Sequence, residues 1–486
     1  MQTHTLAAHD RRRAPSLTIT ELWQLLAVAL PVLGALLAAL PAVDLAYHVR
    51  AGGELLDTGR IALTDTYTFT RAGEPWLNQQ WGAQAILALA HRATGWEGLA
   101  VLRAVLVGCV FALVLWACCR VGASPRQAAL LTLAAFVVSI GALALRPQLF
   151  GMLLFAMAVA LVADRRRHPG RLWLLVPLTA LWANLHGSFF LGAAILGFAW
   201  LEDLHDREPG ARRTFLVSAA AAVATLVNPF VLGVWGYALG LSTSSLITSS
   251  ITEWQPTSIR TPLGALFFAS ALAVLALIAR RSRVTPWPTL LWLGFLFALG
   301  AYAVRGTAWW PLAAAVVTAG LIERPAVEHV RTERPRRLND VLAAAIVVVI
   351  VVLLPWWKPA DPETGRRGLV TFAPSALTTE LHALAEPGDR LLAPQPWASW
   401  FEYAVPALPV YVDSRIELMG PDLWEEYVSL VNLNEGWRAV LDGRGVTIVV
   451  VDPERTAELG AALGDEPSWR RAHVDDDGAI FVRSDR

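Results

Sequence analysis

The stretch Pro41–Trp81, PAVDLAYHVRAGGELLDTGRIALTDTYTFTRAGEPWLNQQW, follows the first long apolar run of the chain and is polar, charged and aromatic. Asp44 and His48 stand four residues apart near its start, a spacing that places both side chains on one face if a helix continues past the apolar run. Asp65 follows later in the same stretch. A loop that gathers carboxylates and a histidine beside a membrane is the first place to look for chemistry.

Composition places most of the chain in a membrane. Of 486 residues, 55% are hydrophobic and only 16% are charged, and the mean hydropathy is +0.47, which is outside the range of soluble domains of this length. We therefore predict a polytopic α-helical membrane protein. The formal net charge of zero argues against a nucleic-acid partner, because no basic surplus is left to neutralise phosphates. The three cysteines, Cys109, Cys118 and Cys119, belong to one apolar segment and suit neither a disulfide framework nor a metal site.

Apolar runs predict about eleven transmembrane helices. The first, Leu22–Val43, follows an N-terminal tail of residues 1–21 and is longer than the apolar part of a typical signal peptide. The others are expected at about Glu97–Trp116, Gln127–Leu145, Leu149–Val162, Trp173–Ala183, Phe189–Leu204, Phe215–Leu239, Leu263–Ile278, Leu290–Val304, Trp309–Ile322 and Leu338–Leu354. The membrane domain then covers residues 22–355, and its first outer loop covers residues 44–96.

Arginine asymmetry predicts the side of the membrane on which each loop lies, since basic residues accumulate in cytoplasmic loops. Alternate connections carry arginine clusters, at Arg120 and Arg126; Arg165, Arg166, Arg167 and Arg171; Arg207, Arg212 and Arg213; Arg280, Arg281 and Arg283; and Arg324, Arg331, Arg334, Arg336 and Arg337. The other connections are nearly free of basic clusters. We expect a multi-pass protein of the cell membrane with its N-terminus in the cytoplasm and its C-terminus outside.

This topology brings nearly all unusual polar residues of the membrane domain to one outer rim. They come from six separate stretches: Asp44, His48 and Asp65; Arg146 and Gln148; Asn184, His186 and Ser188; Asn228; Glu253, Trp254 and Gln255; and Arg305. Each also has a structural interpretation, because Arg146 and Asn228 precede prolines that end or kink helices, and Asn184 with His186 suits a polar turn. As a set, they predict a site more strongly than any single member does.

The segment Trp81–His91, between polar flanks, has an apolar helical pattern that is too short to span a bilayer. We expect it to lie along the membrane surface. Trp76, Trp81 and Trp96 are typical of aromatic anchors at that level.

A second domain begins after the last span. Residues 356–368 form a linker rich in proline and charge, and residues 369–486 alternate short β-branched runs with helical patterns. We predict an extracytoplasmic α/β domain that folds alone, with strands in DRLLAPQ, LPVYVDSR, VTIVVVD and GAIFVRS and helices over Pro374–Ala385, Leu423–Leu430 and Glu435–Arg444. Asp413, Arg415 and Glu417 alternate in YVDSRIEL, which favours a strand end with one solvated face.

These features together resemble the GT-C superfamily of membrane glycosyltransferases, which includes the protein mannosyltransferases and the lipid A aminoarabinose transferase. The shared layout is an acidic residue directly after the first span, a long first outer loop, many further spans and an outer C-terminal domain. It covers about Leu22–Leu354, and its one motif is Asp44 with a second acidic residue in the same loop. The pattern DLAYHVRAGGELLDTGRI, TDTYTFT, LRPQLF, WANLHGS and EWQP is similar to large groups of bacterial membrane proteins. The close acidic pair of the mannosyltransferases is missing here.

The resemblance implies an inverting transfer of a hexose or pentose from a polyprenyl-phosphate donor to an envelope acceptor outside the membrane. Asp44 would take the proton of the acceptor hydroxyl, and Arg146 and Arg305 would bind the departing phosphate. Asp65 and His48 would complete the catalytic group by sharing a proton, orienting the acceptor or holding an ion. The other rim residues of this site would be Gln148, Asn184, His186 and Glu253. A divalent cation is an open alternative, and no other cofactor is implied.

Two rival functions stay open at this stage. A secondary transporter would keep ionisable residues at mid-membrane, whereas the predicted spans are nearly free of charge, with Arg103 the main exception. A non-catalytic scaffold that displays the outer domain would tolerate loss of the rim residues. A common location of Asp44, Arg146 and Arg305 would favour the enzyme.

Overall fold

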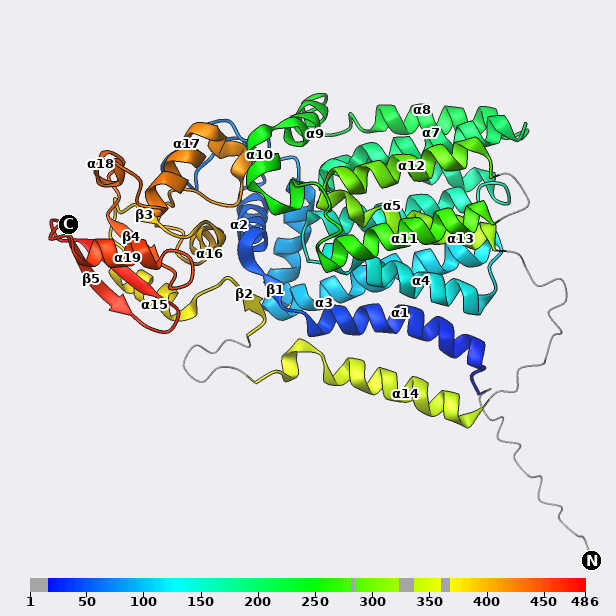
Figure 1. The fold of residues 1–486 in the computed structure, drawn as a ribbon, viewed down its shortest axis with the longest axis horizontal. Coiled ribbons are helices and arrows are strands. Elements are labelled where there is room, and N and C mark those ends of the chain that lie inside the picture. Colours follow the sequence, from blue (N-terminus) through cyan, green and yellow to red (C-terminus); the bar gives the residue numbers. More distant parts are fainter. Residues whose placement is uncertain (1–15, 281–284, 323–335, 360–367) are drawn as a thin grey trace, which may run out of the picture.

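A computed structural model describes residues 16–280, 285–322, 336–359 and 368–486. An elongated helical part adjoins a smaller α/β domain at one of its ends (Figure 1). The helices of the helical part are α1 (Ile19–Leu37), α2 (Ala42–Thr58), α3 (Trp81–Val121), α4 (Pro125–Ser139), α5 (Pro147–Ala163), α6 (Leu175–Leu185), α7 (Phe190–His205), α8 (Ala211–Ala224), α9 (Gly233–Thr243), α10 (Ser245–Ser250), α11 (Pro262–Ala279), α12 (Trp287–Tyr302), α13 (Trp310–Leu321) and α14 (Arg337–Val352).

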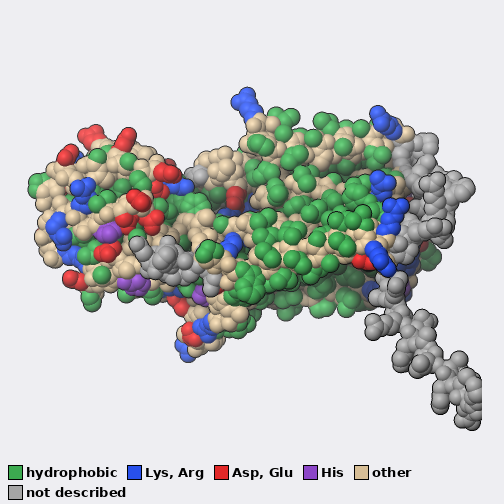
Figure 2. Space-filling view, turned by 90° about the horizontal axis from the view of Figure 1, so that it is seen from below, with side chains coloured by type: hydrophobic (Ala, Val, Ile, Leu, Met, Phe, Trp, Pro, Cys, Tyr) green, Lys and Arg blue, Asp and Glu red, His purple; other side chains and the backbone are tan. Residues whose placement is uncertain are grey.

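Five segments among the described residues are long and apolar enough to cross a membrane by length and composition: Ile19–Leu37, Trp81–Val121, Pro125–Ala142, Gly187–His205 and Pro262–Ala279. Two shorter apolar helices, α5 and α12, accompany them. Hydrophobic side chains cover most of the visible face of the helical part, as expected where lipid and not water is the solvent (Figure 2). The prediction of a polytopic membrane protein is confirmed, and the count of eleven spans stays a prediction.

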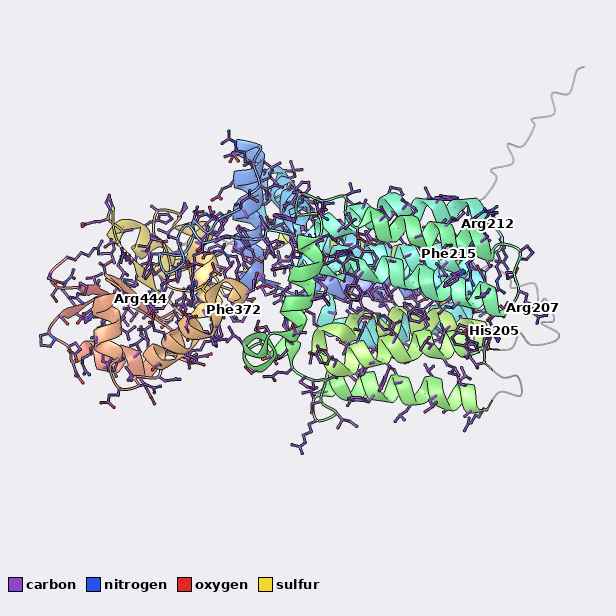
Figure 3. All side chains as sticks on the ribbon, turned by 90° about the horizontal axis from the view of Figure 1, so that it is seen from above. His205, Arg207, Arg212, Phe215, Phe372 and Arg444 are labelled. Atoms are coloured by element: carbon purple, nitrogen blue, oxygen red, sulfur yellow. The ribbon has the colours of Figure 1, made fainter. Side chains whose placement is uncertain are left out.

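Basic side chains gather at the end of the helical part that lies away from the α/β domain. Figure 3 shows His205, Arg207 and Arg212 at that end, opposite Phe372 and Arg444 of the α/β domain. Other predicted cytoplasmic clusters join the same end through contacts, since Arg167 donates to the backbone oxygen of Arg120 and Arg166 pairs with Asp206, Asp203 and Glu208. The predicted clusters at 281–283 and 324–334 lie outside the described residues.

Two predicted spans end earlier than the apolar pattern indicates. The run Leu22–Val43 ends as a helix at Leu37, because residues 40 and 41 form a short strand, β1 (Leu40–Pro41), before α2 begins. The run Phe215–Leu239 breaks between α8 and α9. Pro229 cannot donate a helical hydrogen bond, and the Asn228 carbonyl Oδ1 accepts the backbone N–H of Phe230 at 2.8 Å, which fixes a turn.

The predicted surface helix Trp81–His91 is the first segment of α3. It is separated from the long apolar segment by a kink at Thr94 and Gly95, where Gly95 has φ of 66°. Its inner face packs against α2 so closely that a Cβ on Gly52 would lie 2.0 Å from the backbone oxygen of Gln84. Glycine is therefore required where α2 and α3 cross. The two helices pack together next to the α/β domain.

The α/β domain contains β2 (Val370–Thr371), α15 (Ser375–Leu384), β3 (Leu391–Leu392), α16 (Gln395–Ala404), α17 (Ile416–Val431), α18 (Trp437–Gly443), β4 (Ile448–Val451), α19 (Ala457–Gly464), β5 (Trp469–Val474) and β6 (Ala479–Arg483). Its sheet has the order β3-β4-β6-β5, with β3 and β4 parallel and the other pairs antiparallel. Side chains of β4 alternate between two cores, with Ile448 and Val450 on one face and Val449 and Val451 on the other. The predicted α/β architecture is confirmed.

One of these two cores also contains residues of the helical part. Ala42 and Ala46 of α2 are fully buried in the same cluster as Ile448 and Val450. The domain boundary predicted at Leu369 therefore excludes two residues that complete the core of the α/β domain. The prediction of a strand in LPVYVDSR is wrong, because this segment does not form a regular strand. Val410 makes only isolated bridges, to Leu391 and to Thr68.

Candidate functional site

An ion triple joins three segments that are far apart in the sequence. Asp44 lies in the first turn of α2, and its Oδ2 forms an ion pair with Nε of Arg146 at 3.1 Å. The same guanidinium pairs with the carboxylate of Glu253 in the short helix η4 (Thr252–Trp254). Arg146 precedes Pro147, so its extended backbone aims the side chain away from α5 and toward α2. The carboxylate of Asp44 and then that of Glu253 raise the pKa of Arg146.

Arg305 contacts two segments beside Arg146, namely the start of α5 and the short helix η4. It lies in η5 (Val304–Ala308), and its Nε donates to Oε1 of Gln148 at 3.3 Å. The Gln148 amide donates back to the Arg305 backbone oxygen at 3.2 Å, and the guanidinium lies 5.5 Å from the ring of Trp254. Gln148 is two residues after Arg146, and Trp254 directly follows Glu253. The sequence predicted that Asp44, Arg146, Gln148, Glu253 and Arg305 belong to one rim, and these contacts link all five.

This rim is partly open to solvent. The side chains of Asp44, Arg146 and Glu253 are 23%, 19% and 39% exposed. A ligand can therefore reach the carboxylates and the guanidinium without unfolding the site, while the partial burial strengthens their electrostatic interactions relative to those in free solution.

His48 lies one turn further along α2 and is only 2% exposed. Its Nδ1 contacts Nε2 of Gln84 at 3.3 Å, and Gln84 and Asn78 exchange two hydrogen bonds of 2.8 Å. Burial, with the positive charges of Arg146 and Arg305 next, lowers the pKa of His48 to about 3. His48 is therefore neutral at physiological pH. Gln84 and Asn78 were missed from the sequence, where they look like ordinary residues of a surface helix and its flank.

The lowered pKa of His48 predicts acid sensitivity. Unfolded chains bind a proton at the ordinary pKa of 6.5, whereas folded His48 does so only near pH 3, so its contribution to stability is complete above pH 6.5 and is lost as the pH falls toward 3. We expect the free energy of unfolding of His48→Gln to depend less steeply on pH between 6.5 and 5 than that of the wild type. The difference in slope corresponds to about one bound proton. Unfolding of the purified full-length protein in detergent measures this. His382→Gln, on the exposed side of α15, is the control, and an unflattened His48→Gln profile would contradict the assignment.

Asp65 does not share the ion triple, which corrects the role predicted for it. It is 1% exposed, its Oδ1 accepts from Nη2 of Arg415 at 2.7 Å, and it also accepts the backbone N–H groups of Tyr67 and Thr68 at 3.1 and 3.3 Å. Arg415 in turn pairs with Asp413, and both are buried. The prediction of a solvated strand end at Asp413 and Arg415 is therefore wrong. The alternating charges around Arg415 do not show that its partner Asp65 lies 350 positions earlier in the chain. They therefore do not show that these side chains are buried.

The polar residues at the end of α6 and in the turn that follows it contact neighbouring segments of the helical part. Asn184 accepts from the indole N–H of Trp81 at 3.0 Å and donates to the backbone oxygens of Ala180 and Val227, each at 2.8 Å. His186 is buried and contacts the hydroxyl of Ser188 at 2.8 Å. Asn184 thus connects α6 to the start of α3 and to the turn that follows α8. His186 remains a predicted rim residue.

The donor set does not fit a divalent cation. Within the described residues, no group of three or more His, Cys, Asp and Glu side chains is arranged to hold a metal ion. The two carboxylates nearest each other at the rim, Asp44 and Glu253, are bridged by Arg146, whose guanidinium supplies the positive charge between them.

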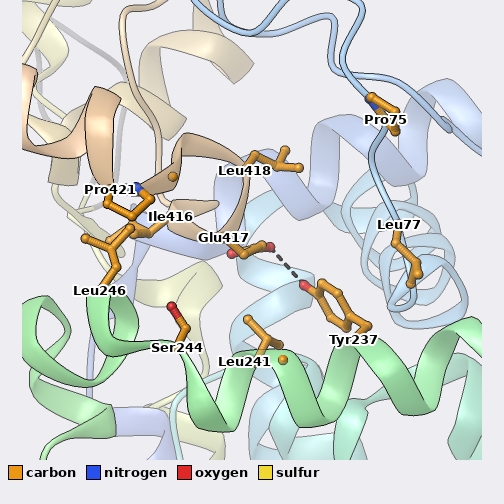
Figure 4. Close-up of a pocket in the computed structure, with 12 residues that line it drawn as sticks. Pro75, Leu77, Tyr237, Leu241, Ser244, Leu246, Ile416, Glu417, Leu418 and Pro421 are labelled. Carbon is orange, nitrogen blue, oxygen red and sulfur yellow. Dashed lines mark hydrogen bonds between the residues drawn. The ribbon is translucent and has the colours of Figure 1, made fainter.

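A cavity of about 420 Å³ lies between the α/β domain and the helical part (Figure 4). Its walls come from α9 and α10, from Pro75 and Leu77 of the first outer loop, and from the start of α17. Most lining side chains are apolar. At its base the hydroxyl of Tyr237 donates to Oε1 of Glu417 at 2.9 Å, and burial raises the pKa of Glu417. An apolar cavity with one polar pair suits a ligand that is mostly hydrophobic.

Comparison with solved structures identifies the fold. The oligosaccharyltransferase of Archaeoglobus fulgidus in its apo form superposes with a TM-score of 0.57 at 13% identity, over 90% of this chain and 69% of that chain. The same enzyme, AglB, in complex with an inhibitory peptide and a dolichol-phosphate gives 0.56 at 13% identity, over 95% and 74%. A third structure, tethered to an acceptor peptide with an NVT sequon, gives 0.55 at 12% identity, over 89% and 69%.

The sequence comparisons add no relative. No family model and no curated protein matches the sequence. At this level of identity the likeness concerns the fold, and it agrees with the layout that the GT-C resemblance predicted. The chain therefore has the fold of an oligosaccharyltransferase, a polytopic membrane part followed by a C-terminal soluble domain.

Proposed function

We propose that this protein is a membrane glycosyltransferase that moves a sugar from a polyprenyl-phosphate carrier to an envelope acceptor outside the membrane. The observation that carries the proposal is the ion triple of Asp44, Arg146 and Glu253 beside Arg305, in a chain with an oligosaccharyltransferase fold. The similar enzyme has been solved with a dolichol-phosphate and with an acceptor peptide. A lipid phosphate and an acceptor that carries a nucleophile are the two ligands that these charges suit.

Arg146 links binding of the donor to activation of Asp44. Its guanidinium is shared by two carboxylates in the ligand-free site. A lipid phosphate that binds Arg146 and Arg305 competes with Asp44 for that guanidinium, because phosphate oxygens match its planar fork. Asp44 then loses its ion pair when the donor is in place, and its carboxylate is free to face the acceptor.

In the transfer step, the hydroxyl oxygen of the acceptor bonds to the anomeric carbon of the sugar while the bond from that carbon to the phosphate oxygen breaks. The hydroxyl proton passes to Asp44, and the bonding electron pair leaves with the lipid phosphate, whose charge is stabilised by Arg146 and Arg305. Attack opposite the leaving phosphate inverts the anomeric configuration. Neutral His48, through Gln84, supports the helix that carries Asp44.

Arg146→Lys tests the phosphate role. Lysine keeps the charge but replaces the planar fork by a single point, so we expect the KM for the donor to rise about tenfold with a smaller change in kcat. The assay presents a panel of polyprenyl-phosphate hexoses and pentoses to the purified protein, with bacterial membranes as acceptor source, and measures released polyprenyl phosphate. Arg92→Lys is the control, because Arg92 forms an exposed pair with Asp57 at 2.7 Å.

Two results would contradict this assignment. An unchanged donor KM in Arg146→Lys removes Arg146 from the phosphate site. Failure of the wild-type protein to consume any donor of the panel contradicts the proposed function itself.

The orientation of the chain in the membrane is tested by reporter fusions. The arginine clusters share the end of the helical part away from the α/β domain, so alkaline phosphatase fused after Arg167 is expected to be inactive in the cytoplasm. The same reporter fused after Asp422 is expected to be active outside. A cytoplasmic signal at Asp422 would reverse the orientation and contradict an outer site.

The contacts of Arg103 argue against the transporter alternative. Arg103, the charged residue that stands out in the predicted spans, is 2% exposed and donates to the backbone oxygens of Ala35, Ala38 and Ala39. It thereby satisfies carbonyl groups at the C-terminal end of α1. Its contacts are those of a helix cap and not of an ion pathway.

A further inference from the structure

Helix α2 has three faces with three different neighbours. Asp44 and His48 face the rim of the helical part, where they contact Arg146 and Gln84. Leu45 and Val49 belong to the large hydrophobic core of the helical part. Ala42 and Ala46 belong to the core of the α/β domain, against α16. The residue spacing of four on each face is that of one continuous helix, so movement of any face moves the others.

A short parallel pairing ties the entry of α2 to the α/β domain. In it, Leu40 and Pro41 of β1 align with Val370 and Thr371 of β2, and the Leu40 N–H donates to the Leu369 oxygen at 2.7 Å. The last paired residue, Pro41, is the N-cap of α2. The start of the helix is thus fixed three residues before Asp44.

Ser414 of the α/β domain then binds the backbone beside Asp44. Its hydroxyl donates to the backbone oxygen of Val43 at 2.7 Å. Because that proton is used, the hydroxyl of Ser399 on α16, at 2.7 Å, is the donor to Ser414 Oγ. Ser399 is fully buried. The bond therefore comes from a rigid, buried position and not from a mobile surface side chain.

Arg415, the next residue, binds the segment that follows α2. Its guanidinium pairs with Asp65 and Asp413 and lies 4.6 Å from the ring of Trp76 and 4.7 Å from that of Tyr67. All of its side chain is buried. Ser414 and Arg415 together hold the start of α2 and the loop that follows it against one edge of the α/β domain.

We infer that the C-terminal domain positions the proposed base: Ser414, with Arg415 beside it, is a positioning residue that fixes the first turn of α2 and so the distance from Asp44 to Arg146. This deepens the proposed function, on which its catalytic part rests. The domain acts through the backbone of α2, because neither side chain contacts the ion triple in the described structure.

Three serine variants of the full-length protein test the inference. Ser414→Ala removes the bond to Val43 and keeps the Arg415 pairs, and Ser414→Thr restores a hydroxyl. Ser484→Ala is the matched control, because its hydroxyl also donates to a backbone oxygen of the same domain, that of Pro467 at 3.2 Å, away from α2. Hydrogen exchange of the peptide covering residues 42–58 is measured in detergent, together with kcat and KM for the donor.

We expect Ser414→Ala to speed exchange in α2 about fivefold, the equilibrium factor of one net hydrogen bond, with no change over α19. We expect kcat to fall about tenfold or more at an unchanged donor KM, because small displacements of a reacting group are costly while the phosphate site is intact. Ser414→Thr should recover most of both effects, and Ser484→Ala should show neither.

The two proposals fail in different ways. Unchanged exchange of α2 in Ser414→Ala overturns the inference whatever the turnover. Faster exchange in α2 with no consumption of any donor by the wild type leaves the positioning role supported and overturns the proposed function. Faster exchange with an unchanged kcat overturns the catalytic part of the inference.

Discussion

Asp44→Asn is expected to lower turnover by about a hundredfold or more, the usual size of a general-base contribution. Asparagine keeps the volume of the side chain but cannot take the acceptor proton or form an ion pair with Arg146. The donor KM is expected to change less than kcat, because Glu253 still holds Arg146 in place. Release of polyprenyl phosphate by folded, membrane-inserted protein gives both constants.

Asp57→Asn is the matched control for this experiment. Asp57 lies at the other end of α2 and also pairs with an arginine, Arg92, but its side chain is 68% exposed and makes no contact with the ion triple in the described structure. Its loss is expected to leave kcat within twofold, since exposed ion pairs contribute about 1 kcal/mol or less. Normal turnover in Asp44→Asn would end the proposed mechanism and favour the non-catalytic scaffold.

Arg415→Met is expected to destabilise the junction of the two parts by about 3–5 kcal/mol, because it leaves the buried carboxylates of Asp65 and Asp413 without their cation. Nearby, Glu402 is fully buried, and burial followed by the charge of Asp413 raises its pKa, so this neighbour supplies no positive charge that could replace Arg415. Urea unfolding of the full-length protein in detergent, followed by tryptophan fluorescence, measures the loss.

Arg438→Met controls for the loss of an arginine in the same domain. Arg438 pairs with Glu466, but its side chain is 61% exposed, so the expected change is below about 1 kcal/mol. Equal stability of Arg415→Met and the wild type would mean that the buried pairs are replaceable, and the two parts would then be joined by apolar packing alone.

Hydrophobic runs predicted that the chain has a polytopic helical membrane part. Solvent preference is a local property of each segment, so apolar length identifies helices without knowledge of their neighbours. The same logic failed where local chemistry interrupts a run, as at Asn228 and Pro229, or where the chain pairs with a distant strand, as at Leu40 and Pro41. Those breaks depend on single residues within runs that stay apolar on average.

The rim residues were predicted as a set, but their pairing was not. Asp44, Arg146, Glu253 and Arg305 stood out because charges are rare in apolar sequence, and topology alone assigned them to one side. Which carboxylate meets which guanidinium depends on how the helices cross. Sequence reasoning accordingly gave Asp65 a place beside Asp44, although its true partner is Arg415 of the other domain.

The sequence by itself determined that this is a helical membrane protein with a C-terminal α/β domain and a charged segment after its first apolar run, because hydropathy, strand periodicity and charge act over neighbouring residues. The tertiary structure alone decided that α2 is shared by two cores and that Ser414 and Arg415 hold the loop carrying Asp44. Those contacts join residues about 350 positions apart, and their strength comes from burial, which depends on what packs against each residue and is not encoded in any local stretch.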